Sequence, residues 1–190
     1  MIDKNEFKKI HLSKSSVGTE EKLALARVID SGYLGMGIEV QQFEQEIAQF
    51  LGTESDVVCV SSGTAALHLA LQAVGVSAGD EVIVPSFTYV ATFQAISATG
   101  AIPIACDVSE QTAFLDVRDA ELRITDKTKV IIAVHYGSSS EGMEGLVDLA
   151  RRHGLRIIED AAHSFGCQHN SEFVGSKGDI TCFSFDGIKN

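Results

Sequence analysis

Short apolar runs alternate with helical segments along most of this chain, and that alternation limits the folds it can adopt. The runs are rich in valine and isoleucine and lie at 57–60, 81–84, 102–106, 130–134 and 156–159. Helical segments are predicted between most of them, at 64–74, 90–99 and 141–153. Strands that are apolar at nearly every position are typical of a parallel sheet buried on both faces. We therefore predict an α/β fold with a mostly parallel sheet and helices on both faces.

Two amphipathic helical segments precede this region, at about 19–31 and 39–51, and a glycine-rich loop at 32–37 separates them. At the other end, the glycines and alternating residues of 166–185 suggest a hairpin-like pair. We find no internal repeat or internal domain boundary. Residues 1–190 are therefore treated as one unit that includes an N-terminal helical segment of about 1–52.

The composition narrows the classes of function. The formal net charge of −11 argues against nucleic acid or an anionic membrane as the main partner, since both favour basic patches. No apolar run approaches the roughly 20 residues that span a bilayer, and no signal-peptide pattern opens the sequence. The four cysteines are scattered without a CxxC pair, so we expect buried free thiols, no metal centre and a cytoplasmic protein.

The segment Ser61-Ser62-Gly63-Thr64-Ala65 follows the first predicted strand and opens the next predicted helix. The N–H groups and the dipole at a helix start favour an anion, and Gly63 permits the close approach of a ligand. Taken alone, these residues are more often a simple N-cap turn. Neither a Walker lysine pattern nor a GxGxxG fingerprint is present, which weakens the common nucleotide-binding hypotheses.

A carboxylate, a hydroxyl and a lysine near the end of the sequence suggest a pyridoxal phosphate site. Asp160 ends an apolar strand, and Ser184 and Lys189 lie five residues apart. In such a site a carboxylate holds the ring nitrogen, a hydroxyl contacts the phosphate and an amine forms the Schiff base. Adjacent strand residues point to opposite faces, so only one of Glu159 and Asp160 can face a given pocket.

Tyr89 and His163 are further candidates, each with a structural alternative. Tyr89 follows a strand end and can stack on a flat ligand, although a core aromatic is the commoner use. His163 is equally well explained as a structural histidine. A metal site built from Asp160, His163 and His169 is an alternative, but the three residues lack a recognisable ligand spacing.

The order of four motifs makes a family recognisable. SSGTAALHLAL, GDEVIVPSFTYVAT, IIEDAAHSFG and GDITCFSFDGIKN together resemble the DegT/DnrJ/EryC1/StrS family of sugar-nucleotide aminotransferases. The resemblance implies a type I aspartate aminotransferase-like fold. It covers only about the first half of a typical member, so it implies the N-terminal part of the cofactor-binding large domain, incomplete at the C-terminus and without the small C-terminal domain.

The resemblance also implies roles around pyridoxal 5'-phosphate. Gly63, Thr64 and Ala65 would hold the phosphate at a helix start, with Ser184 adding a hydroxyl. Tyr89 would stack on the pyridine ring.

The same resemblance implies roles for three further residues around the ring. Asp160 would pair with the ring nitrogen, and His163 would lie near the phenolic oxygen. Lys189 would be the Schiff-base lysine and the base that moves the proton. A dehydratase branch has histidine in the place of this lysine, so Lys189 favours transamination.

The implied reaction is transamination of a keto sugar nucleotide by an amino acid donor such as glutamate, in amino-sugar biosynthesis for a cell-surface polysaccharide or a natural product. Asp186 and the run at 138–142 depart from the family pattern and leave the substrate open. Because members are dimers with longer chains, we expect a homodimer of the full-length protein or complementation by a C-terminal half, and an inactive 190-residue chain. The alternatives are a truncated non-catalytic or regulatory member and another type I pyridoxal phosphate enzyme, such as a lyase or desulfurase.

Overall fold

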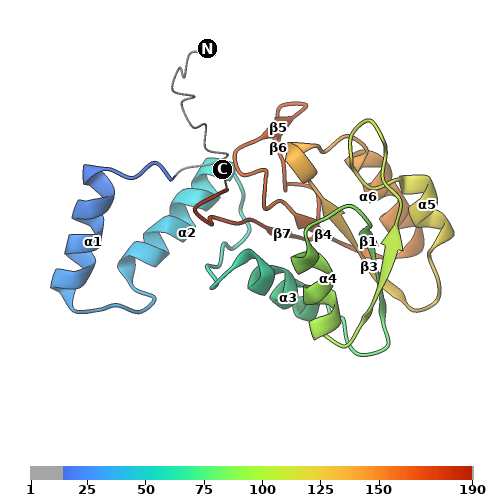
Figure 1. The fold of residues 1–190 in the computed structure, drawn as a ribbon, viewed down its shortest axis with the longest axis horizontal. Helices are drawn as coiled ribbons and strands as arrows, with labels where there is room; N and C mark the ends of the chain where they lie inside the picture. Colours follow the sequence, from blue (N-terminus) through green and yellow to red (C-terminus); the bar gives the residue numbers. More distant parts are fainter. Residues whose placement is uncertain (1–14, 190) are drawn as a thin grey trace, which may run out of the picture.

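A five-stranded parallel sheet forms the centre of the molecule (Figure 1), seen in a computed structural model that describes residues 15–189. Its strand order is β2-β1-β3-β4-β7, and every neighbouring pair is parallel. The strands are β1 (Glu81–Pro85), β2 (Ile102–Cys106), β3 (Thr128–Val134), β4 (Arg156–Asp160) and β7 (Ile180–Cys182). The predicted parallel sheet is confirmed.

Helices cover both faces of this sheet, as predicted. On one face lie α3 (Gly63–Ala73) and α4 (Val90–Ala98), and on the other α5 (Val117–Leu122) and α6 (Met143–His153). Successive strand side chains enter different cores: Val82 and Val84 pack with α3 and α4, whereas Ile83 packs with α6. Burying each such side chain stabilises the fold by about 1.5–3 kcal/mol.

Two N-terminal helices, α1 (Thr19–Ser31) and α2 (Ile38–Leu51), extend to one side of the sheet (Figure 1). Helix α1 buries none of its residues, and α2 buries Ile47. Each helix ends at a glycine, Gly32 or Gly52, in the left-handed conformation that favours glycine over other residues.

The predicted strand at 57–60 is absent from this part of the structure. These residues have no regular secondary structure, and the N–H group of Cys59 donates to Glu44 Oε1 in α2 at 2.7 Å. A strand needs a hydrogen-bonding neighbour, and no other described strand pairs with this segment. Cys59 is consequently half-exposed, as is Cys167, while Cys106 and Cys182 are buried free thiols as expected.

The C-terminal hairpin is smaller than predicted. Strands β5 (Gln168–His169) and β6 (Glu172–Phe173) pair antiparallel, but β7 joins the main sheet beside β4. Helix α5 was not expected, because its six residues are too few for a periodic apolar pattern.

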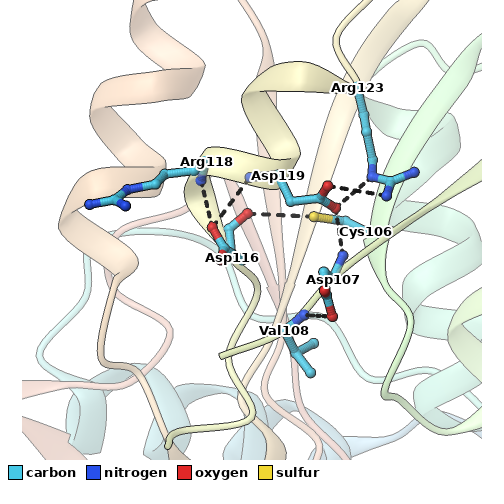
Figure 2. Close-up of polar contacts among 7 residues, drawn as sticks. All are labelled: Cys106, Asp107, Val108, Asp116, Arg118, Asp119 and Arg123. Atoms are coloured by element: carbon cyan, nitrogen blue, oxygen red, sulfur yellow. Dashed lines mark hydrogen bonds and ion pairs between the residues drawn. The ribbon is translucent and has the colours of Figure 1, made fainter. Parts of the chain in front are cut away.

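A polar cluster fixes α5 to the end of β2, where the N–H of Asp107 donates to Asp119 Oδ2 at 2.7 Å (Figure 2). Asp116 caps the helix, since its Oδ1 accepts the N–H groups of Arg118 and Asp119 at 2.8 and 3.2 Å. Asp119 accepts two hydrogen bonds from Arg123, at 2.6 and 3.1 Å, which hold the pKa of its carboxyl at about 2. The cluster is structural.

Candidate active site

Asp160 ends β4 with its side chain on the face covered by α3 and α4, and only 7% of its surface is exposed. Its Oδ2 accepts the hydroxyl of Thr92 at 2.9 Å, and its Oδ1 accepts the N–H of Ala162 at 3.3 Å. Burial raises the pKa of Asp160, and these two hydrogen bonds oppose that effect. Among residues 15–189, the hydrogen-bond donors to the Asp160 carboxylate are Thr92 and Ala162, and neither carries a charge.

Glu159, the preceding residue, points to the opposite face of the sheet and pairs with His135. Its carboxylate lies 2.7 Å from Nε2 of His135, and both side chains are 1% exposed. Burial would raise the pKa of Glu159, but the bonds from His135 and from the N–H groups of Gly178 and Lys177 hold it below its usual value. The expectation that only one of the two carboxylates faces a given pocket is confirmed.

Lys189 and His163 meet near the exposed face of Tyr89. The Nζ of Lys189 lies 2.9 Å from Nε2 of His163 and 5.9 Å from the centroid of the Tyr89 ring. A neutral imidazole can accept a hydrogen bond from Nζ at Nε2. Burial, followed by the charge of Lys189, lowers the pKa of His163, which favours that neutral form.

The start of α3 lies against the segment that carries Ser184. A β-carbon placed on Gly63 would be 3.3 Å from Cβ of Ser184, so a larger residue would crowd this contact. Gly63 and Thr64 open the helix, where N–H groups have no intrahelical acceptor. The N–H of Ala65 already donates to the N-cap hydroxyl of Ser62 at 3.1 Å. The N–H groups of Gly63 and Thr64 and the hydroxyl of Ser184 are therefore candidate hydrogen-bond donors at the start of α3.

The turn after β3 contacts His163 through Ser138 and Tyr136. Ser138 Oγ donates to the carbonyl of His163 at 2.8 Å, and the Tyr136 ring lies 5.6 Å from the imidazole. Ser164 Oγ donates to the carbonyl of His135 at 3.1 Å. These bonds join the 135–139 turn to the 160–164 segment and so fix the position of the imidazole.

An aromatic cluster attaches α2 to the segment leading to Lys189. The Phe43 ring contacts Phe185 at 5.1 Å between centroids, and Phe165 contacts Phe185 at 4.9 Å. Phe50 of α2 also stacks on Phe165 at 5.3 Å. The cluster connects the N-terminal helices to the chain that bears Ser184 and Lys189.

Sequence reasoning did not find Thr92, Tyr136, Ser138 or the His135–Glu159 pair. Thr92 carried a usable signal, since it lies three residues after Tyr89 and so on the same side of a helix. His169 lies on β5, and the described residues contain no group of three or more metal-ligating side chains suited to a metal ion. Within the same residues, no helix is long and apolar enough to cross a bilayer.

The fold is the large-domain fold of the aspartate aminotransferase type. DesV of S. venezuelae, solved in complex with a ketimine intermediate, has a TM-score of 0.83 and 43% identity, and the match covers 90% of this chain and 46% of DesV. NtdA of Bacillus subtilis, solved with bound cofactor PMP, has a TM-score of 0.84 and 34% identity, covering 96% of this chain and 43% of NtdA.

Residues 15–190 match the DegT/DnrJ/EryC1/StrS aminotransferase family, and the chain belongs to that family. The spore coat polysaccharide biosynthesis protein SpsC of Bacillus subtilis (strain 168) is 41% identical over 174 residues, which are 92% of this chain and 44% of SpsC. The chain therefore spans less than half the length of these relatives.

Proposed function

We propose that the protein, as part of its full-length chain, transfers an amino group from an amino acid donor such as glutamate to a keto sugar nucleotide, with pyridoxal 5'-phosphate as cofactor. Membership of an aminotransferase family supports the reaction type. The name of SpsC supports a role in the biosynthesis of a polysaccharide. The observation that carries the proposal is the contact of Lys189 with His163 beside Tyr89.

The described residues fit this cofactor. The N–H groups that open α3 and the Ser184 hydroxyl provide donors for a phosphate, and a β-carbon at position 63 would lie in tight contact with Cβ of Ser184, at 3.3 Å. Tyr89 is 69% exposed and offers an aromatic face. Asp160 is a buried carboxylate that a cationic ring nitrogen would neutralise.

When bound, pyridoxal phosphate supplies a carbonyl for amines and a ring that withdraws electrons from the substrate carbon. The residues of this chain position the cofactor and move protons. We assign Asp160 to the ring nitrogen, Tyr89 to the ring face, and Gly63, Thr64, Ala65 and Ser184 to the phosphate.

Lys189 is the residue we assign to the covalent attachment and to proton transfer. To act as a base its amine must be neutral, and Nε2 of His163 is placed to accept a hydrogen bond from Nζ. His163 thereby orients the amine.

The exposed apolar side chains of α1 support burial of this helix in a larger assembly. Leu23, Leu25 and Ile29 are 57–67% exposed. We propose that a second copy of the chain or its C-terminal half covers them, which light scattering of the full-length protein would test. A monomer with α1 exposed would contradict that part of the proposal.

The transamination itself is tested in two half-reactions with the full-length protein. Adding L-glutamate to the cofactor-loaded protein should release 2-oxoglutarate and change the cofactor absorbance. A panel of keto sugar nucleotides should then restore the original absorbance and yield an amino sugar. Failure of the first half-reaction with every amino acid donor would contradict the proposed function.

A further inference from the structure

Thr92 lies in the first turn of α4, three residues after Tyr89, and is fully buried. Its hydroxyl oxygen is 2.9 Å from Asp160 Oδ2 and 2.9 Å from Thr88 Oγ1. An ionised carboxylate can only accept, so the hydrogen of Thr92 lies in the bond to Asp160. The hydrogen of the other bond must then come from Thr88. The three groups form a directed chain from Thr88 to Thr92 to Asp160.

Two elements hold the Asp160 carboxylate from two sides. Thr92 reaches Oδ2 from α4, and the N–H of Ala162 reaches Oδ1 from the turn after β4. A carboxylate has about four lone-pair sites, so it retains capacity for a further donor after these two bonds. The side chain is fixed in rotation and still able to accept one more hydrogen bond.

The same helical turn also holds Tyr89. The N–H of Thr92 donates to the carbonyl of Tyr89 at 3.1 Å, and Tyr89 is the N-cap of α4. A single turn therefore places both the aromatic side chain and the hydroxyl that orients the carboxylate.

We infer that Thr92 is a positioning residue: its hydroxyl, supported by that of Thr88, keeps the Asp160 carboxylate ionised and turned toward a cationic ring nitrogen. The inference rests on the proposed function, because the ring nitrogen belongs to the proposed cofactor. The second part of the inference, that Thr92 keeps Asp160 ionised, does not depend on the cofactor.

The groups around Asp160 explain why the Thr92 hydroxyl affects the ionisation of this carboxyl. Burial raises the pKa of Asp160, and the Thr92 hydrogen bond is the largest of the opposing effects. A protonated His163 or His135 would also favour the ionised form, while burial, followed by the charge of Asp160, raises the pKa of the Cys182 thiol to about 12. His163 is neutral beside Lys189, and the His135 ring is paired with Glu159, so neither replaces a direct donor.

The test compares four forms of the full-length protein: wild type, Thr92→Val, Thr92→Ser and Thr88→Val. Valine keeps the shape of threonine without the hydroxyl, and serine keeps the hydroxyl. Thr99→Val is a matched control, since it removes a hydroxyl at the other end of α4 that bonds the carbonyl of Ile96. Two quantities are measured: the titration of the Asp160 carboxyl by carbon-13 NMR without cofactor, and the affinity for pyridoxal phosphate as a function of pH.

We expect Thr92→Val to shift the Asp160 titration to higher pH and to weaken cofactor binding about tenfold at neutral pH, the size expected for one hydrogen bond to a charged group. Thr92→Ser should restore most of both properties, Thr88→Val should show a smaller shift, and Thr99→Val should change neither. An unshifted titration in Thr92→Val would overturn the inference. So would equal losses in Thr92→Val and Thr92→Ser, because they would show that Thr92 acts through packing alone.

The two proposals fail in different ways. If wild type binds no pyridoxal phosphate, the proposed function fails, while the titration still decides whether Thr92 keeps Asp160 ionised. If wild type binds the cofactor and Thr92→Val binds it equally well at every pH, the proposed function stands and the inference about Thr92 is wrong.

Discussion

The amine Nζ of Lys189 lies 2.9 Å from Nε2 of His163, although 26 positions separate the two residues in the chain. His163 follows β4, and Lys189 follows β7, the neighbouring strand in the sheet. Parallel strands bring their carboxyl ends to one edge, and ligands of open α/β sheets bind at that edge. The pairing of β4 with β7 is thus what brings the amine and the imidazole together.

Replacing His163 tests whether this contact contributes to proton transfer. We expect His163→Leu to lower the rate of the glutamate half-reaction about 100-fold, because the amine loses the acceptor that orients it. His163→Gln keeps an acceptor and should lose less. Stopped-flow absorbance measures both rates, and equal rates in wild type and His163→Leu would show that the contact has no role in the reaction.

The lowered pKa of His163 also predicts a pH dependence of stability. Burial and the charge of Lys189 disfavour the protonated imidazole, so the folded pKa lies below the ordinary value of 6.5. The stability that this group contributes is present above 6.5 and is lost as pH falls through the folded pKa. In cofactor-free protein, thermal melts from pH 7 to 5 should show a smaller loss for His163→Gln than for wild type. A greater loss in the variant would contradict the assignment.

The raised pKa of Asp160 predicts a pH dependence of stability with the opposite sign. Its folded pKa is raised by burial, so its contribution to the stability of the cofactor-free protein is present at low pH and lost as pH rises through that pKa. A cationic ring nitrogen relieves this loss. The increase in melting temperature caused by pyridoxal phosphate should therefore grow from about pH 4 to 7 in wild type, starting near the ordinary aspartate pKa. Asp160→Asn should show a weaker pH dependence, and an equal dependence in both proteins would exclude the pairing.

Gly63 tests the proposed phosphate site. In Gly63→Ala the new methyl carbon would lie 3.3 Å from Cβ of Ser184, so Ser184 must shift slightly, and we expect about tenfold weaker binding of pyridoxal phosphate. Gly145→Ala in α6 is the matched control, since its methyl carbon meets Val117 at an ordinary 3.6 Å. The control should be neutral or stabilising by about 0.5–1 kcal/mol with unchanged binding. Equal affinities in the two variants would contradict the phosphate assignment.

Phe43 tests the connection between α2 and the segment bearing Lys189. Its ring meets Phe185 edge-on, a contact worth about 0.5–1.5 kcal/mol beyond burial. Phe43→Leu should lower the melting temperature by a few degrees and weaken cofactor binding by a small factor, because the 183–189 segment loses a support. Leu122→Ala, at a residue 85% exposed, should change neither property.

The sequence predicted the parts of the fold that depend on local pattern. Strands β1 and β3 are apolar at most positions because helices bury both of their faces, and that pattern is visible without a structure. The segment 57–60 has the same composition, yet it forms no strand because pairing depends on a neighbour distant in sequence.

The candidate site, like the fold, could be predicted from the sequence only where it depends on local features. The short separation of Ser184 from Lys189 and the strand-end position of Asp160 are local features of the sequence. The Thr92–Asp160 bond joins residues 68 positions apart, and the His135–Glu159 pair joins residues 24 apart. Such contacts arise from the packing of α4 against the sheet and from strand register, so composition and spacing alone could not identify them.

The covalent attachment of the cofactor to Lys189 is the most direct test of the whole account. The full-length protein would be mixed with pyridoxal phosphate, reduced with borohydride, digested and mapped by mass spectrometry, with Lys189→Ala as the control. We predict a pyridoxyl group on Lys189 in wild type and on no residue in the control. A modification at another lysine, such as Lys177, or none in the wild-type protein, would contradict the account.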